Sequence, residues 1–226
     1  MSRTVVVTGA AKGIGLAIVE AFTALGDNVI GLSHADCDVT DENAVASTFA
    51  RIGPVDVLVN NAGIYLDHPV LGTSYEEWQA AWQATLGVNL IGAANVTWCA
   101  VQHMTASAQR GGRIVNVGSR GAFRGEPSHP AYGASKAGLH AFGQSLAVAL
   151  APHGITVASV DPGYVATDMT AAELATAAGD VIRAQSPFDR VATVQEIAAA
   201  VVYLASPEAE WASGAVLDLN GASYLR

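Results

Sequence analysis

Charged residues are scarce in this sequence. Eleven Lys and Arg and 20 Asp and Glu make up 14% of the 226 residues, against about 25% in an average soluble protein. Apolar residues make up 51%, which excludes a disordered chain, because such chains lack the apolar surface that offsets chain entropy. The net charge of −9 disfavours nucleic acid and anionic membranes as partners, since an acidic surface repels both. We expect a folded protein with no nucleic acid and no membrane as its main partner.

Cysteine is scarce as well. Cys37 and Cys99 could form at most one bridge, and neither belongs to a CxxC pair or a metal-binding cluster. Two reduced thiols are typical of a cytoplasmic protein, and no metal site is expected. The apolar run Val5–Val7 near the N-terminus is too short for an export signal. We therefore expect a cytoplasmic location.

Short β-branched runs alternate with Ala- and Leu-rich stretches of helical periodicity. The runs that predict buried strands are 5–7, 28–32, 55–59, 113–117, 155–160 and 215–219. The stretches that predict helices are 13–25, 41–52, 75–110, 132–152 and 194–205. Regular alternation indicates right-handed βαβ units, hence an α/β fold with helices on both faces of a parallel sheet. We expect one domain over residues 1–226, with a short lid-like insert at about 169–187.

A glycine-rich turn follows the first strand. Residues 8–15 read Thr-Gly-Ala-Ala-Lys-Gly-Ile-Gly, which places Gly9, Gly13 and Gly15 at the opening of a helix. Backbone N–H groups at a helix N-terminus can approach a pyrophosphate only where side chains do not block them. In the first strand–turn–helix of an alternating chain, this pattern predicts a dinucleotide site, with an ordinary tight turn as the alternative.

Tyr132 and Lys136 are four residues apart, so on a helix they lie on one face, one turn from each other. An ammonium near a phenol favours the phenolate and lowers the pKa of the tyrosine from about 10 toward neutrality. This predicts that Tyr132 can act as a general acid and a general base. The pair alone has low specificity, because many solvated helices carry the same spacing.

Five motifs in order resemble the short-chain dehydrogenase/reductase family. They are the turn at 8–15, Asn60-Asn61-Ala62-Gly63, Val88-Asn89-Leu90, Ser119 followed by Tyr132-Gly133-Ala134-Ser135-Lys136, and Pro162-Gly163 with Thr167. The resemblance runs from Thr8 to about Gly221. It implies a Rossmann-type, doubly wound, mainly parallel seven-stranded sheet, made of about six clear strands plus one short. It also implies an NAD(P)(H)-dependent oxidoreductase that transfers hydride between nicotinamide and a ketone or secondary alcohol.

The resemblance implies a catalytic set of Asn89, Ser119, Tyr132 and Lys136. The Ser119 hydroxyl would orient the substrate oxygen and stabilise a developing alkoxide. Asn89 matches the residue whose backbone carbonyl holds a proton-relaying water, although it could simply bridge buried helices. Lys136 would also bind the nicotinamide ribose.

The cofactor shell is carried over from the same resemblance. Its members are Gly9, Lys12, Gly13, Ile14, Gly15, Ser33, His34, Asp38, Val39, Asn60, Ala62, Gly63, Tyr132, Lys136, Pro162, Gly163, Val165 and Thr167. Within this set, Asp38-Val39 matches the adenine-contacting pair, and Asn60–Gly63 would pack beneath the adenosine half. The Val165 backbone and the Thr167 hydroxyl would hold the carboxamide.

The residue after the second strand distinguishes NAD from NADP. A carboxylate there accepts the ribose 2′-OH and repels a 2′-phosphate, but this chain has Ser33-His34, with Lys12 in the glycine turn. We expect NADP(H) to be favoured, with NAD(H) as the alternative because Asp36 follows closely. The chain from Leu32 to Asp38 leaves little or no room for the family's usual helix, so the adenosine edge is expected to be more exposed.

We expect the substrate-binding part of the site to be lined by Tyr65, Arg120, Phe123, Arg124, Tyr164 and the insert. The arginines either bind an anionic or polar substrate or point to solvent or a neighbouring subunit. Two alternative functions stay open: a 3-oxoacyl-[acyl-carrier-protein] reductase, and a catalytically silent dinucleotide sensor. A carrier-protein reductase would favour a basic docking patch, which this acidic chain does not display. A sensor would typically have lost the catalytic tyrosine or lysine, and this chain has both. A methyltransferase is disfavoured by the Tyr132–Lys136 pair.

The missing charge is concentrated in two predicted helices. Trp78 to Gln109 has no charged residue, and Ala131 to His153 has only Lys136. The first is long enough for a membrane, but amides interrupt it, so a buried helix is expected. In a monomer, surface helices carry charged residues on the side that faces solvent. The lack of charged residues in these two helices therefore fits a subunit interface. With the family resemblance, this predicts a homotetramer (or homodimer) through helices at about 75–110 and 132–152.

Overall fold

The computed structural model describes residues 2–106 and 111–226. Six parallel strands form one sheet in the order β2-β1-β3-β4-β5-β6. Their bounds are β1 Thr4–Thr8, β2 Asn28–Leu32, β3 Val57–Asn60, β4 Gly112–Val117, β5 Ile155–Pro162 and β6 Val216–Leu219. The α/β class and the six clear strands predicted from the sequence are therefore confirmed.

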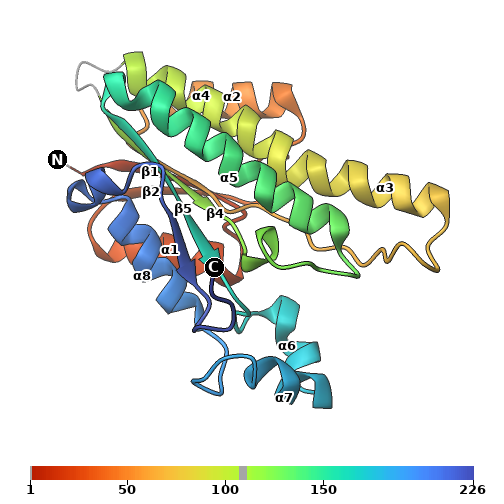
Figure 1. The fold of residues 1–226 in the computed structure, drawn as a ribbon. Coiled ribbons are helices and arrows are strands. Elements are labelled where there is room, and N and C mark those ends of the chain that lie inside the picture. Colours follow the sequence, from red (N-terminus) through yellow and green to blue (C-terminus); the bar gives the residue numbers. More distant parts are fainter. Residues whose placement is uncertain (1, 107–110) are drawn as a thin grey trace.

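Helices cover both faces of the sheet (Figure 1). On one face lie α1 (Gly13–Ala24) and α8 (Val194–Leu204), and on the other lie α2 (Glu42–Ile52), α4 (Ala93–Ala106) and α5 (Pro130–Leu150). A hydrophobic core lies on each face of the sheet, and successive residues of β1 point into opposite cores. Val5 and Val7 pack with α1 and α8, whereas Val6 packs with α2 and α4. Both faces of the strands are apolar because a parallel sheet is buried on both sides.

The expected seventh strand is absent from the described residues. After β2 the chain turns at Ser33–Cys37, where the backbone N–H of Cys37 donates to the Ser33 carbonyl, and it enters α2 at Glu42. Asp41 caps α2 by accepting from the N–H groups of Asn43 and Ala44. The segment between β2 and α2 is thus too short for a further helix and strand. The prediction of seven strands was wrong, and β2 forms the edge of the sheet.

The long helix expected at 75–110 is continuous over Tyr75–Ala106 and includes a π-helical segment. It consists of α3 (Tyr75–Leu86), a π-helical segment η1 (Gly87–Gly92) and α4, and residues 107–110 lie outside the described part. A Cβ on Gly92 would lie 2.6 Å from Val39 Cγ2, so the chain passes very close to the segment after β2. The stretch Tyr75–Ala106 is long and apolar enough to cross a membrane by length and composition. In this fold, however, its two α-helices pack against α5, α2 and β3.

The insert expected at 169–187 contains two short helices, α6 (Asp168–Leu174) and α7 (Ala177–Arg183). They pack on each other and extend past the carboxyl end of the sheet (Figure 1). Thr167 begins α6 with a capping box, in which the side chain of Thr170 accepts from the Thr167 N–H. The remaining short helices are of 3-10 type: η2 (Arg120–Ala122), η3 (Ala151–His153) and η4 (Pro207–Ala212).

Candidate active site

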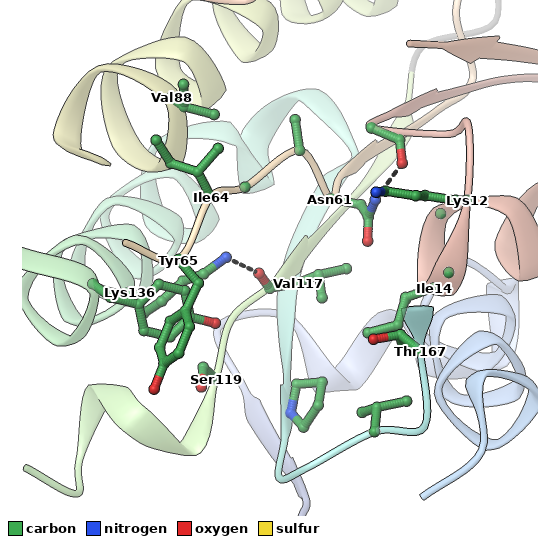
Figure 2. A pocket seen from close by; sticks show the side chains of 18 of the residues that line it. Lys12, Ile14, Asn61, Ile64, Tyr65, Val88, Val117, Ser119, Lys136 and Thr167 are labelled. Carbon is green, nitrogen blue, oxygen red and sulfur yellow. Dashed lines mark hydrogen bonds between the residues drawn. The ribbon is translucent and has the colours of Figure 1, made fainter. Parts of the chain in front are cut away.

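A cavity of about 590 Å³ lies beyond the carboxyl ends of the central strands. Its walls come from the glycine turn, the segments after β2 and β3, the end of β4, the start of α5 and the segment after β5. In Figure 2, Lys12, Ile14 and Thr167 lie on one side of this cavity, and Tyr65, Ser119 and Lys136 lie on the other. The strand order reverses between β1 and β3, and such switch points are where α/β sheets bind their ligands.

The glycine turn is compact for steric reasons. Gly9 (φ +66°) and Gly13 (φ +57°) have left-handed backbone conformations that glycine adopts without strain. A Cβ on Gly15 would lie 2.2 Å from the Gly9 carbonyl oxygen. Asn61 Nδ2 donates to the carbonyl oxygens of Thr8 (2.9 Å) and Gly9 (3.1 Å), which ties the turn to the segment after β3. The turn therefore keeps the N-terminus of α1 open toward the cavity, as a pyrophosphate site requires.

The cavity gathers every predicted cofactor residue except Asn60. The Asn60 side chain is buried beside α4, where its Nδ2 donates to Thr97 Oγ1 (2.8 Å) and Asn116 Oδ1 (2.9 Å). Its neighbour Asn61 lies just beyond the end of β3 and lines the cavity. Asn60 is thus placed in a buried polar network, and this placement corrects the expectation that it contacts the cofactor.

Ser119, Tyr132 and Lys136 converge at one end of the cavity. Ser119 follows β4, and its Oγ accepts from the N–H of Gly121 at 3.1 Å, which fixes the serine at the start of η2. Lys136 Nζ donates to the carbonyl oxygen of Val117 at 2.7 Å (Figure 2) and lies 5.7 Å from the centre of the Tyr132 ring. Helix α5 therefore presents the phenol and the ammonium to the strand end that carries the serine.

The ionisation of this group differs from the expectation. Burial raises the pKa of Tyr132 to about 12, and a hydrogen bond with Ser119 partly opposes the rise. Burial lowers the pKa of Lys136 to about 8, and the carboxylate of Asp161 acts in the opposite direction. The predicted lowering of the Tyr132 pKa by Lys136 is not present here, because desolvation of the phenolate dominates and the ammonium is bound to Val117. At neutral pH, Tyr132 carries its proton.

Asn89 is buried in η1 and joins two walls of the site. Its Oδ1 accepts from the Ile64 N–H (2.9 Å), and its Nδ2 donates to the Ile64 carbonyl (3.1 Å) and to Ser135 Oγ (3.1 Å). The side chain thus holds the segment after β3 against α5. The π-helical backbone around it is typical of functional sites, and the water-holding role of its carbonyl stays a prediction.

The wall beside Tyr132 is aromatic and acidic. Tyr65 stacks on His129 with ring centres 3.6 Å apart and meets Tyr132 edge-on at 4.7 Å. The Tyr65 hydroxyl lies 3.5 Å from a carboxylate oxygen of Glu126, and burial raises the pKa of Glu126. Glu126 was not predicted as a site residue from the sequence, although it lies between Ser119 and Tyr132, two predicted catalytic residues. It gives the substrate side of the cavity a hydrogen-bonding group.

The arginines after Ser119 anchor the surrounding chain. Arg120 is 4% exposed, and its guanidinium donates to Ser223 Oγ (2.6 Å) and Gln185 Oε1 (2.7 Å). Arg124 donates to the same Gln185 oxygen at 2.8 Å. The Arg120 guanidinium thus joins η2 to the insert and to the C-terminal segment, and the residue also lines the cavity. Of the expected walls, Arg124 and Phe123 do not line the cavity.

The adenosine end contains two carboxylates within a tight turn. Ser33 donates from its N–H (2.9 Å) and its hydroxyl (2.5 Å) to Asp36 Oδ2, and Asp38 Oδ1 accepts from Thr40 (2.8 and 2.9 Å). These hydrogen bonds lower the pKa of both carboxyl groups. His34 Nδ1 lies 3.9 Å from Asp38 Oδ1. The turn therefore carries negative charge next to Ser33, the residue expected to read the ribose.

Replacing Gly15 by Ala tests the glycine turn. The added Cβ would clash with the Gly9 carbonyl, so the free energy of unfolding should fall by about 1–3 kcal/mol, and affinity for both nicotinamide dinucleotides should fall about tenfold or more. Urea denaturation and calorimetric titration measure the two effects. Gly125→Ala is the control, because a Cβ there meets nothing within 4 Å. Unchanged dinucleotide affinity in Gly15→Ala would contradict the assignment.

Comparison with known proteins identifies relatives over the whole chain. A family model described as enoyl-(acyl carrier protein) reductase matches residues 30–221. The chain is 36% identical over 245 residues to the 3-oxoacyl-[acyl-carrier-protein] reductase FabG of Escherichia coli (strain K12), covering 99% of this chain and 98% of that one. It is also 36% identical over 238 residues to the 3-oxoacyl-[acyl-carrier-protein] reductase MabA of Mycobacterium avium, with 98% and 89% covered.

A solved structure shows the same fold. It is the ligand-free aldohexose dehydrogenase AldT of Thermoplasma acidophilum, 32% identical, with a TM-score of 0.90 over 100% of this chain and 95% of the other. Sequence identity, full-length coverage and the shared fold agree with the motifs. The chain therefore belongs to the short-chain dehydrogenase/reductase family of NAD(P)(H)-dependent oxidoreductases.

Proposed function

We propose that this chain interconverts a ketone and a secondary alcohol with NADP(H), and that Tyr132 is its general acid and base. The observation that carries the proposal is the meeting of Ser119, Tyr132 and Lys136 at one end of a cavity that has the glycine turn in its wall. A dinucleotide fits this arrangement, because a Cβ at Gly9 or Gly15 would close the turn. When bound, the nicotinamide supplies hydride in reduction and takes it up in oxidation.

The chain's own groups manage the proton and the developing charge. In reduction, the Ser119 hydroxyl donates a hydrogen bond to the substrate carbonyl oxygen and stabilises its growing negative charge. Tyr132 then gives its proton to that oxygen as the carbonyl carbon gains hydride, so the product is a neutral alcohol. The Lys136 ammonium, 5.7 Å from the centre of the Tyr132 ring, offsets part of the charge on the phenolate that Tyr132 leaves behind, and in the resting site burial outweighs this attraction. In oxidation, the same phenolate accepts the alcohol proton.

A 3-oxoacyl thioester is the first substrate candidate. The curated relatives at 36% identity are 3-oxoacyl-[acyl-carrier-protein] reductases. The net charge of −9 provides little attraction for a carrier protein that docks on basic residues. We therefore propose that the thioester is taken from a small carrier as readily as from a carrier protein.

A hydroxylated carbonyl compound is the second candidate. Glu126 and Tyr65 offer hydrogen-bonding groups on the substrate side of the cavity, next to Tyr132. A sugar hydroxyl can donate to such a carboxylate. The solved relative in this case is an aldohexose dehydrogenase. A panel of both substrate classes, assayed with each nicotinamide, distinguishes the two candidates.

Tyr132→Phe tests the acid–base role. Loss of the phenol hydroxyl should lower kcat about 10²–10⁴-fold while the Kd of the dinucleotide stays within a factor of about three, because the ring and its packing remain. Steady-state kinetics and fluorescence titration provide the two values. Tyr203→Phe, on the exposed face of α8, is the matched control and should be fully active. Turnover retained by Tyr132→Phe would refute the assignment.

The preference for NADP(H) rests on the ribose end. Ser33 provides a hydroxyl in place of a carboxylate, and Lys12 and His34 line the same part of the cavity. Cationic and hydroxyl groups favour a 2′-phosphate. Asp36 opposes this preference, because its carboxylate holds the Ser33 hydroxyl and adds negative charge. The preference is therefore expected to be moderate.

Two substitutions change this balance in opposite directions. Ser33→Asp should shift the ratio of kcat/KM values toward NADH by about tenfold or more, since a second carboxylate repels the 2′-phosphate. Asp36→Asn should shift the ratio toward NADPH, because it removes a charge and frees the Ser33 hydroxyl. Asp41→Asn, at the N-cap of α2, is the control for a charge lost outside the cavity. Identical ratios in all variants would mean that Ser33 does not read the ribose.

We also propose a homotetramer, or a homodimer, assembled through α4 and α5 together with α3, and a cytoplasmic location. Apolar side chains on this helix layer are exposed in the single chain: Ile91 by 56%, Trp98 by 65% and Val148 by 80%. Exposed apolar groups on helices with almost no charge fit the core of a subunit interface. The location is supported by the two cysteines, which are free thiols.

Light scattering tests the assembly. The native chain should elute at the mass of a tetramer or dimer at micromolar concentration. Trp98→Glu with Val148→Glu should lower that mass, because a buried unpaired charge is costly. Trp211→Glu is the control, since this fully exposed tryptophan lies on η4, outside these helices. A monomeric mass for the native chain would reject the assembly.

A further inference from the structure

A buried histidine–aspartate pair lies behind the catalytic side chains. His140 Nε2 is 2.8 Å from Asp161 Oδ1, and the two side chains are 5% and 0% exposed. His140 follows Lys136 on α5 at the same spacing by which Lys136 follows Tyr132, so the three side chains form one row on the helix. Asp161 lies near the end of β5, next to the end of β4. The pair thus extends the catalytic row into the interior.

Gly118 shows how close the pair is to the site. A Cβ on Gly118 would lie 2.3 Å from both Asp161 Oδ1 and His140 Cε1. This glycine directly follows Val117, whose carbonyl accepts from the Lys136 ammonium, and directly precedes Ser119. The carboxylate is therefore packed against the same strand end that holds the lysine and the serine.

The pair is enclosed and has few polar partners. The Phe123 ring stacks on the His140 imidazole, with centres 5.4 Å apart and planes at 8°. Within the described residues, no ring nitrogen of His140 and no carboxylate oxygen of Asp161 has a partner in good hydrogen-bond geometry, although the two groups face each other. A buried carboxylate with such incomplete pairing is costly for stability. Its presence beside catalytic groups therefore points to a functional role.

We propose that Asp161, held in place by His140, is a positioning residue that supplies the buried counter-charge of the Tyr132–Lys136 pair. The inference rests on the proposed acid–base role of Tyr132. A carboxylate favours a nearby ammonium and disfavours a nearby phenolate. In agreement with this, Asp161 raises the pKa of both Lys136 and Tyr132. Burial is the main cause of both shifts, and the charge of Asp161 extends to higher pH the range in which Tyr132 is protonated and Lys136 is charged.

Other charged groups around the pair are accounted for. On β6, Asp218 is the register partner of Asp161, and its carboxylate accepts from Arg226 Nε at 3.0 Å. The Arg226 guanidinium in turn lies 3.9 Å from the centre of the Phe123 ring that stacks on His140. From the loop before α5, Glu126 also raises the pKa of Tyr132. Asp218 is neutralised within its own ion pair, which leaves Asp161 as the buried carboxylate on the catalytic row.

The pH dependence of kcat/KM in Asp161→Asn tests the proposal. Loss of the negative charge lowers the pKa of Tyr132 and that of Lys136, and both the protonated phenol and the ammonium are lost as pH rises. The alkaline limb of the profile for reduction should therefore move to lower pH by about half to one unit. His140→Leu should move the alkaline limb in the same direction, because the carboxylate loses the polar group that faces it. His140→Gln keeps a polar side chain facing Asp161 and should restore the native profile. Ser159→Ala, another buried position on β5, is the control and should leave the alkaline limb in place.

A second measurement does not require turnover. The ultraviolet absorbance of the phenolate, taken as the difference between the native chain and Tyr132→Phe, should titrate at lower pH when Asp161 is replaced by Asn. If Asp161→Asn does not fold, the double variant Asp161→Asn with His140→Leu removes both polar groups and is compared in the same way. If the native enzyme is active but the variants keep its pH profile and its phenolate titration, the counter-charge role of Asp161 is overturned and the proposed function is not. A native enzyme with no turnover on any carbonyl or alcohol would instead overturn the proposed function.

Discussion

The hydrogen bond from Lys136 Nζ to the Val117 carbonyl is the contact on which the site depends. It joins α5 to the end of β4, the strand that leads directly into Ser119. A buried ammonium requires such a partner, because it has lost its water. By holding α5 in this position, the bond also places Tyr132, one turn earlier, opposite the serine. The acid–base group is therefore assembled by one helix and the chain that follows one strand.

The parallel sheet brings the two halves of the site together. The strands that supply the glycine turn, Asn61, Ser119 and Pro162 all end at the same edge, so their following residues line one cavity. The glycine turn is closed by atoms that leave no room for a Cβ at Gly15. At the other end, burial raises the pKa of Tyr132 and lowers that of Lys136. The phenol of Tyr132 is thus protonated at neutral pH in this state of the site.

Much of this could be predicted from the sequence, because motifs and apolar periodicity are local properties. The strands, most helices and the Ser119–Tyr132–Lys136 group were found in this way. The π-helical segment η1 within the long helix was missed, since the apolar pattern continues through it. The partners of Arg120 were also out of reach, because Ser223 is distant in sequence. The raised pKa of Tyr132 depends on burial, which spacing alone does not report.

The central claim is that this site moves hydride between a nicotinamide and a carbonyl carbon, with Tyr132 providing the proton. The most direct measurement uses reduced cofactor that carries deuterium on the transferring carbon, together with a 3-oxoacyl thioester or a hydroxylated ketone. Mass spectrometry of the product should find the deuterium on the new carbinol carbon, and in the same time Tyr132→Phe should form about a hundredfold less labelled product, or less still. Tight binding of the cofactor without label in any product would contradict the account and would indicate a dinucleotide sensor.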